Sequence, residues 1–280
     1  MVALSDPVVA TAIAALVGLC IGSFLNVVIH RLPKMLERAW KAQCAELNGE
    51  NAAPEPAYNL IVPRSACPAC GQRINAWQNL PVVSWLMLSG RCAGCNAPIS
   101  PRYPVVELLG AIVAASAVWH FGATPAGLAA CVLLWSLLAL TMIDFDTQLL
   151  PDNITLPLVW AGLIVNLWGV FTPLPNAVIG AVAGYLSLWT IYWLFKLIRG
   201  KEGMGYGDFK LLAALGAWLG WQVLPVIVLL SSVVGAAIGI ALIVFKGRDH
   251  SVPMAFGPYL AIAGAFALFF GPNLVKLFFP

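Results

Sequence analysis

Residues 222–245 read QVLPVIVLLSSVVGAAIGIALIVF and contain no charged side chain. About 20 apolar residues in a helix cross the hydrocarbon core of a bilayer. The whole chain has the same character, since 61% of its 280 residues are hydrophobic and only 10% are charged. A soluble domain carries about 25% charged residues. The sequence therefore predicts a membrane protein.

Similar apolar runs recur along the chain and predict an all-α polytopic fold with about eight transmembrane helices. The expected spans are roughly 8–29, 105–122, 126–143, 153–171, 176–197, 208–220, 222–245 and 256–278. The sixth run is short enough to be tilted or re-entrant. The first run is not followed by a small-residue cleavage site, so we expect a retained anchor rather than a signal peptide.

Lysine and arginine set the expected orientation, because cytoplasmic loops are enriched in both. One topology places all of the 15 basic residues except Lys276 on the inside. They fall in or beside residues 30–104, the 197–207 loop and the 246–254 loop, which contains Arg248. We therefore expect a first transmembrane helix within 1–30, a cytoplasmic segment at 31–104 and a membrane-embedded core at 105–280, with both termini outside.

The cytoplasmic segment contains two C-x2-C pairs separated by 21 residues, in CPAC and CAGC: Cys67, Cys70, Cys92 and Cys95. Two such knuckles can supply the tetrahedral all-thiolate shell that suits Zn2+, and Gly71 and Gly94 suit their tight backbone. A reducing cytoplasm disfavours disulfides. The alternative is a metal-free cluster. A closed shell of four thiolates predicts a structural zinc site rather than a catalytic one.

Carboxylates gather where two expected helices meet the inner face of the membrane. Asp144, Asp146 and Asp152 lie in MIDFDTQLLPDNIT (142–155), and Asp208 lies in GMGYGDFK (203–210). Two aspartates at one partly dry site can share a proton, so that one activates water while the other protonates a scissile carbonyl. The alternative is helix capping, which is the natural interpretation of Asp152. The glycines before Asp208 are expected to let the backbone bend and a substrate approach.

These motifs together resemble the bacterial prepilin peptidases, also called type 4 leader peptidases, of the GxGD membrane aspartyl protease family. GSFLNVVIHRLP (22–33), the paired cysteines, IDFDTQLLPDNIT (143–155) and GYGDFK (205–210) carry the resemblance, which covers nearly the whole chain. The resemblance implies that Asp144 and Asp208 are the catalytic aspartates. Asp146 is the neighbour most easily confused with Asp144.

The resemblance also implies an activity. Family members cleave the basic leader of type IV prepilins and pseudopilins after a glycine, at the cytoplasmic face of the bacterial inner membrane. Many then methylate the new N-terminal amine with S-adenosylmethionine. No G-x-G-x-x-G motif after a strand marks a methyl-donor site here. Asn26, Gly90 and Glu107 are candidates by position or resemblance, and each has a packing, turn or interfacial alternative.

Other functions stay open at this point: a peptidase without methyltransferase activity, a proton-coupled transporter, or a zinc-ribbon interaction protein of the secretion machinery. A transporter predicts carboxylates near mid-membrane, whereas these lie at the inner edge. The expected cofactors are Zn2+ and S-adenosylmethionine. The expected partners are prepilins or pseudopilins and membrane lipid, without nucleic acid. The sequence leaves open a homo-oligomer, and whether the client is a type IV pilus or a type II secretion system.

Overall fold

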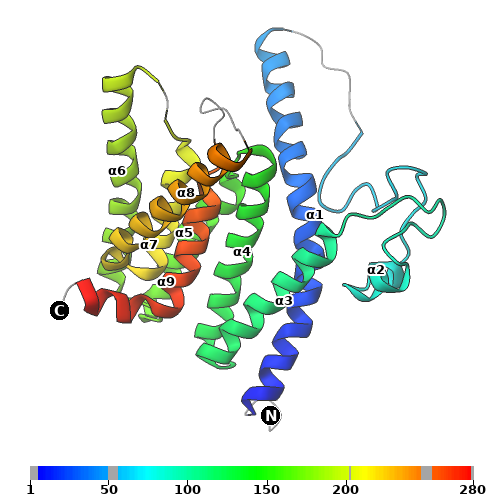
Figure 1. Cartoon of the computed structure of the whole chain (residues 1–280), viewed down its shortest axis with the longest axis horizontal. Helices are drawn as coiled ribbons and strands as arrows, with labels where there is room; N and C mark the ends of the chain where they lie inside the picture. Colours follow the sequence, from blue (N-terminus) through cyan, green and yellow to red (C-terminus); the bar gives the residue numbers. More distant parts are fainter. Residues whose placement is uncertain (1–5, 50–55, 202, 247–253, 279–280) are drawn as a thin grey trace. The chain divides into compact units, whose positions relative to one another are not determined.

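A computed structural model describes residues 6–49, 56–201, 203–246 and 254–278. The described residues are almost entirely helical, with two isolated β-bridges and no strand (Figure 1), which confirms the predicted all-α class. The chain divides into two compact units, Met1–Cys131 and Val132–Pro280. The division falls within α4 (Pro125–Thr147). Arg248, assigned above to a cytoplasmic loop, lies outside the described residues.

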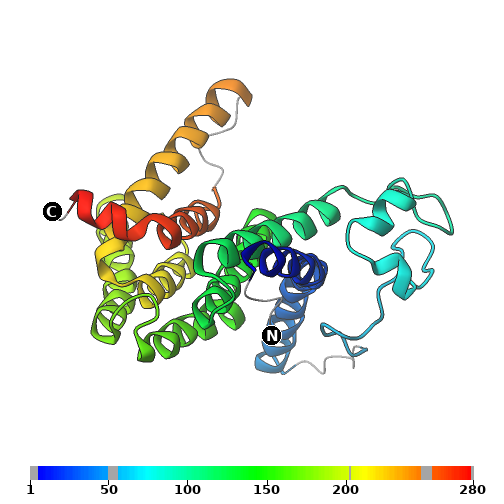
Figure 2. The same cartoon turned by 90° about the horizontal axis from the view of Figure 1, so that it is seen from below.

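The first unit is built on α1 (Pro7–Leu47) and α3 (Arg102–Phe121), which lie side by side (Figures 1 and 2). Their backbones approach closely because glycines line the contact. A Cβ atom on Gly22 would stand 2.6 Å from Cα of Glu107, and one on Gly110 would stand 2.9 Å from Cα of Gly22. Small residues allow such close approach between membrane helices, where packing rather than the hydrophobic effect drives association.

The first helix is much longer than its apolar run. Helix α1 has 41 residues, or about 60 Å at 1.5 Å per residue, which is twice the thickness of a bilayer core of about 30 Å. The apolar run ends near residue 29, but residues 34–47 are rich in Ala, Leu, Glu and Lys, which favour helix. A Glu37–Lys41 ion pair of 2.7 Å supports this extension. Helix α1 therefore continues beyond its apolar run through residues 34–47.

In its described residues, 48–49 and 56–101, the segment between α1 and α3 has little regular structure beyond η2 (Ala76–Asn79) and α2 (Val83–Met87). It is joined to α1 by polar contacts. The guanidinium of Arg31, a buried residue, donates to the carbonyl of Asn59 (3.0 Å). The guanidinium of Arg38 lies 4.4 Å from the centre of the Tyr58 ring. At the other end, the Val82 N–H donates to the carboxylate of Glu107 in α3 (2.7 Å).

The second unit packs its helices around α7 (Tyr206–Leu219), whose residues from Asp208 to Trp218 are mostly buried. The remaining elements are α5 (Asp152–Val165), η3 (Asn166–Trp168), α6 (Leu174–Arg199), η4 (Trp221–Val223), α8 (Leu224–Lys246) and α9 (Gly257–Phe278). Helix α6 crosses α7 at Gly180 and Gly216, where a Cβ on either glycine would overlap the carbonyl oxygen of the other. The indole N–H of Trp218 donates to the carbonyl of Leu158 in α5 (2.8 Å).

The eight expected runs correspond to helices α1 and α3 to α9 in the described part of the chain. Helices α1, α3, α4 and α6 and the stretch Trp221–Phe245 are long and apolar enough to cross a membrane, and Gly257–Gly271 is a shorter apolar helix. Helices α5 and α7 have 14 residues each, or about 21 Å, so neither spans a bilayer core alone. The chain is a multi-pass membrane protein.

Candidate active site

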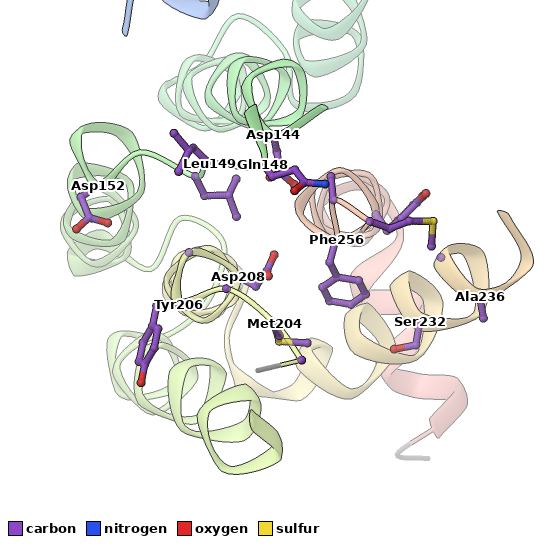
Figure 3. A pocket seen from close by; sticks show the side chains of 18 residues that line it. Asp144, Gln148, Leu149, Asp152, Met204, Tyr206, Asp208, Ser232, Ala236 and Phe256 are labelled. Carbon is purple, nitrogen blue, oxygen red and sulfur yellow. The ribbon is translucent and has the colours of Figure 1, made fainter. Parts of the chain in front are cut away.

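The ends of two helices bring Asp144 and Asp208 together in the second unit. Asp144 lies in the last turn of α4 and Asp208 in the first turn of α7. Both line a cavity of about 760 Å³, and the Asp208 side chain points into it (Figure 3). Asp144 is 4% exposed and Asp208 is 7% exposed. The two carboxyl groups are close enough to interact electrostatically.

Neither aspartate is the capping residue of its own helix, although the Asp208 carboxylate interacts with the backbone N–H of Gly205, the residue that precedes α7. The N-cap of α7 is Gly205, and Asp208 is the third residue of that helix. The Asp144 carboxylate instead accepts the backbone N–H of Gly257, at the start of α9, over 3.0 Å. The contact of the buried Asp144 carboxylate is therefore with another helix, α9, and not with the end of α4.

Two of the glycines before Asp208 are explained by close packing rather than by the expected bending of the backbone. None of Gly203, Gly205 and Gly207 has a positive φ angle, so the backbone there is not in a conformation that only glycine adopts. A Cβ on Gly207 would stand 2.7 Å from Cβ of Leu150, and one on Gly203 would stand 2.8 Å from the Phe195 ring. These two glycines allow close packing. A Cβ on Gly205 would meet only Oδ2 of Asp208, at 3.9 Å, so this glycine leaves space beside the carboxylate.

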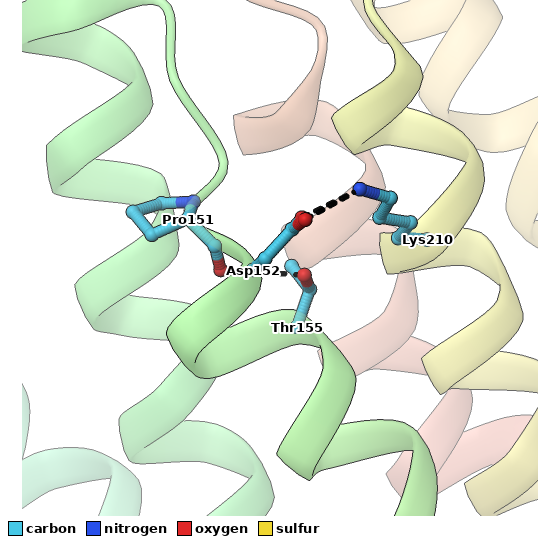
Figure 4. Close-up of polar contacts among 4 residues, drawn as sticks. All are labelled: Pro151, Asp152, Thr155 and Lys210. Carbon is cyan, nitrogen blue, oxygen red and sulfur yellow. Dashed lines mark hydrogen bonds and ion pairs between the residues drawn. The ribbon is translucent and has the colours of Figure 1, made fainter. Parts of the chain in front are cut away.

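The other two aspartates lie differently. Asp146 is exposed and does not line the cavity. Asp152 lines the cavity but is not the expected cap, because the N-cap of α5 is Pro151 and Asp152 is the first helical residue. Its carboxylate accepts both its hydrogen bonds from Lys210 of α7, at 2.6 and 2.7 Å (Figure 4). Asp152 therefore joins the first turns of α5 and α7.

The cavity wall is mainly apolar. Its side chains include Leu149, Leu150, Met204, Phe256 and Tyr259, with Gln148 and Ser232 among the polar ones. The cavity volume falls in the range of ligand sites, about 300–1,000 Å³. Apolar walls restrict water and strengthen electrostatic interactions inside. Two buried carboxyl groups in such a space can share a proton and exchange it with a bound peptide.

The four paired cysteines of the first unit form a candidate metal centre. Their sulfur atoms all lie within 4.8 Å of one another. The Cys67 and Cys95 sulfurs are 3.8 Å apart, and those of Cys70 and Cys92 are 4.0 Å apart. A tetrahedron with Zn–S bonds of about 2.3 Å has edges of about 3.8 Å. The donor set therefore fits a metal ion of this kind.

The two knuckles differ in detail from the prediction. Gly71 has a φ angle of +73°, as its tight turn requires, but the equivalent residue of the second knuckle is Asn96, with φ +56°. Asparagine tolerates this left-handed conformation. Gly94 instead provides space, since a Cβ there would overlap Gln72. Backbone hydrogen bonds from Cys95 and Gly94 lower the pKa of Cys92 to about 6, which favours the thiolate that a metal needs.

The three methyl-donor candidates lie in the first unit, and each has a structural contact. The Asn26 amide donates to the carbonyl of Tyr103 (3.0 Å). Gly90 has a φ angle of +66°, and a Cβ there would stand 2.9 Å from the Trp85 ring. Glu107 is buried and accepts the N–H of Val82. A role for them in holding a methyl donor stays a prediction.

Sequence reasoning missed Gly257. Its signal is modest: FGPY (256–259) places a glycine and a proline at the start of the last apolar run. Such a pair is typical of a helix start. Its proximity to Asp144, 113 positions earlier in the chain, is a property of the tertiary structure.

Comparisons with known proteins identify the family of the chain. Residues 16–121 match the family described as Bacterial Peptidase A24 N-terminal domain, and residues 131–240 match the Type IV leader peptidase family. A protein named Prepilin leader peptidase/N-methyltransferase from Pseudomonas aeruginosa is 53% identical over 275 residues, covering 98% of this chain and 95% of that protein.

Two further relatives have the same name. One from Aeromonas hydrophila is 58% identical over 263 residues, covering 93% of this chain and 91% of that protein. One from Burkholderia pseudomallei is 57% identical over 264 residues, covering 93% and 85% respectively. No solved structure matches the chain. With both matched domains in order and relatives covering nearly its full length, the chain belongs to the type IV leader peptidase family.

Proposed function

We propose that this chain is a bifunctional membrane enzyme that removes the leader of type IV prepilins or pseudopilins and then methylates the new N-terminus. The printed names of its relatives include both activities. The observation that carries the peptidase half is the pairing of Asp144 and Asp208, two buried carboxyl groups from distant parts of the chain that line one cavity. This pairing supports Asp144 and Asp208 as the catalytic residues.

In the proposed reaction, one carboxylate takes a proton from a water molecule as the water oxygen attacks the carbonyl carbon of the leader's final glycine. The other carboxyl group gives its proton to the carbonyl oxygen. The tetrahedral intermediate then collapses, the C–N bond breaks, and the departing amine receives a proton from the dyad. The apolar cavity wall keeps bulk water away from this exchange.

The methyltransferase half uses the amine that cleavage releases. S-adenosylmethionine, when bound, would supply the methyl group of its sulfonium to this amine, which would lose a proton, and S-adenosylhomocysteine would leave. Asn26, Gly90 and Glu107 would be the residues of this chain near the donor. They belong to the compact unit Met1–Cys131, whereas Asp144 and Asp208 belong to Val132–Pro280, and this division favours two sites with different residues.

The enzyme is proposed to lie in the bacterial inner membrane, with residues 31–104 and the aspartates at the cytoplasmic face. In this arrangement residues 1–30 anchor the chain, Cys67, Cys70, Cys92 and Cys95 hold a structural Zn2+, and residues 105–280 form the protease core in contact with lipid. The basic leader of a substrate stays on the same side as the dyad. A reporter fused near residue 50 tests this placement, and a periplasmic signal would contradict it.

The position of the carboxylates favours a peptidase over a proton-coupled transporter. A relay within the membrane needs carboxylates along the span, whereas Asp144 and Asp208 lie at helix ends.

The decisive experiment compares three variants of the purified protein in detergent: Asp144→Asn, Asp208→Asn and Asp146→Asn. The first two keep size but remove proton exchange, so prepilin cleavage should fall below detection. Asp146→Asn is the matched control, because Asp146 is an exposed neighbour outside the cavity, and it should cleave at nearly the normal rate. Normal cleavage by Asp208→Asn would exclude the aspartyl protease mechanism.

The same variants test the second activity. When the substrate is supplied already cleaved, all three should methylate it, because methyl transfer needs an amine and a donor but no carboxylate dyad. Loss of methylation by well-folded Asp144→Asn protein would mean that the two activities share residues.

A further inference from the structure

The first residue of α9 touches one member of the aspartate pair. The Gly257 N–H donates to Oδ2 of Asp144 over 3.0 Å in a buried hydrogen bond. The first N–H groups of a helix have no partner within the helix and point out of its end. Pro258 follows directly and favours a fixed helix start. The start of α9 therefore presents a well-oriented donor to the carboxylate.

Glycine at this position is explained by the contact itself. Gly257 is not among the residues with a positive φ angle, so its backbone does not demand glycine. A Cβ there would stand 2.7 Å from Oδ2 of Asp144 and 3.1 Å from both methyl groups of Leu150. Any larger residue would push on the carboxylate or on Leu150, which also lines the cavity.

We propose that Gly257 is a positioning residue for the aspartate pair. Its N–H holds Oδ2 of Asp144 in place, so that Oδ1 is the oxygen that exchanges a proton during peptide cleavage. Without this bond the carboxyl group can rotate about its last side-chain torsion, which has a broad energy minimum. This inference rests on the proposed peptidase function, in which Asp144 is catalytic.

The first test is Gly257→Ala, with Gly264→Ala as the matched control on the same helix. The Gly264 variant also crowds a neighbour, since its Cβ would overlap Leu215, but it does not touch Asp144. Misplacing a catalytic group by about 1 Å can cost about 100-fold in rate. We expect Gly257→Ala to lower kcat for prepilin cleavage by about 10- to 100-fold with KM changed less than about twofold. Gly264→Ala should lower the thermal midpoint while its kcat stays near normal.

Methylation of an already cleaved substrate monitors folding of Gly257→Ala. If cleavage by Gly257→Ala is normal, or if it falls only as much as in Gly264→Ala, the positioning role is wrong. If the wild-type protein does not cleave prepilin at all, the proposed function fails instead, and the two failures are thereby distinguished.

A second measurement needs no activity and covers the case in which Gly257→Ala does not fold. Amide hydrogen exchange of the Phe256–Tyr259 segment is compared between wild-type protein and Asp144→Ala, which removes the acceptor. Pro258 has no N–H, so few amides contribute. The Gly257 amide should exchange at least about tenfold faster in the variant, which corresponds to a loss of about 1.4 kcal/mol of protection. Equal exchange in the two proteins would show that the hydrogen bond does not hold Asp144.

Discussion

Asn166 is the buried polar residue on which the pairing of α5 and α7 depends most, and its removal gives a quantitative test of the fold. Its side-chain amide donates to the carbonyls of Ala217 and Trp218, both at 2.9 Å. Its carbonyl accepts the N–H groups of Phe171 (3.0 Å) and Thr172 (3.2 Å). One side chain therefore satisfies two carbonyls at the end of α7 and two N–H groups of the loop before α6.

Asn166→Ala deletes all four hydrogen bonds and leaves two α7 carbonyls buried without their side-chain donors. A hydrogen bond within a membrane protein contributes about 0.6 kcal/mol on average, and one in a water-soluble protein contributes about 1 kcal/mol. Each of the four bonds is expected to contribute an energy between these two values. The free energy of unfolding should therefore fall by roughly 2–4 kcal/mol. The effect on cleavage should follow from this loss of stability, because Asp208 lies at the opposite end of α7.

Thermal unfolding of the purified protein in one detergent measures this difference. We expect the midpoint of Asn166→Ala to fall by more than about 4 °C. Asn153→Ala is the matched control, since Asn153 is an exposed asparagine in α5, the helix whose C-cap is Asn166, and its midpoint should move by less than about 1 °C. If the two variants unfold at the same temperature, Asn166 does not hold α5 and α7 together, and the energy assigned to its four hydrogen bonds is refuted.

Three further predictions concern the metal and the site. Elemental analysis should find about one Zn2+ per chain. The metal should be lost in a Cys67→Ser, Cys92→Ser double variant and released on acidification, because protons compete with the metal for the thiolates; metal-free protein prepared without chelator would contradict this. Asp152→Asn should keep cleavage within a few-fold of normal, because its half-exposed ion pair is worth at most about 1 kcal/mol, and a loss as large as that of Asp208→Asn would refute this. Gly205→Ala should fold normally but bind substrate less well, whereas Gly207→Ala should lower the thermal midpoint; the reverse pattern would contradict the packing described above.

The features that the sequence predicted well are those with a local signal. Apolar runs such as 222–245 indicate helices by themselves, and paired cysteines indicate a knuckle by spacing alone. The pairing of Asp144 with Asp208 was expected because the apolar runs predict both beside the same membrane face and because both match the motifs of one family. Their shared cavity agrees with that expectation.

The features that were missed depend on contacts between distant residues. The role of Gly207 is to make room for Leu150, and no pattern within GYGDFK indicates that neighbour. The continuation of α1 through Leu47 was missed for another reason, because hydropathy marks where a membrane span ends but not where a polar helix ends. Asp152 resembled a cap by position, but the cation that it binds, Lys210, lies 58 residues further along the chain.

The ends of three helices, α4, α7 and α9, assemble the candidate site. The partial charges at the helix ends explain why α9 is needed in addition to the two helices that carry the aspartates. A carboxylate is disfavoured at the C-terminal end of a helix and favoured at the N-terminal end, because of the partial charges there. Asp208, in the first turn of α7, has the favourable position, whereas Asp144, in the last turn of α4, does not. The start of α9 compensates by directing the Gly257 N–H at Asp144. A site built from helix ends depends on the position of each helix along its axis. The close contact of Gly180 with Gly216 fixes the position of α7 against α6.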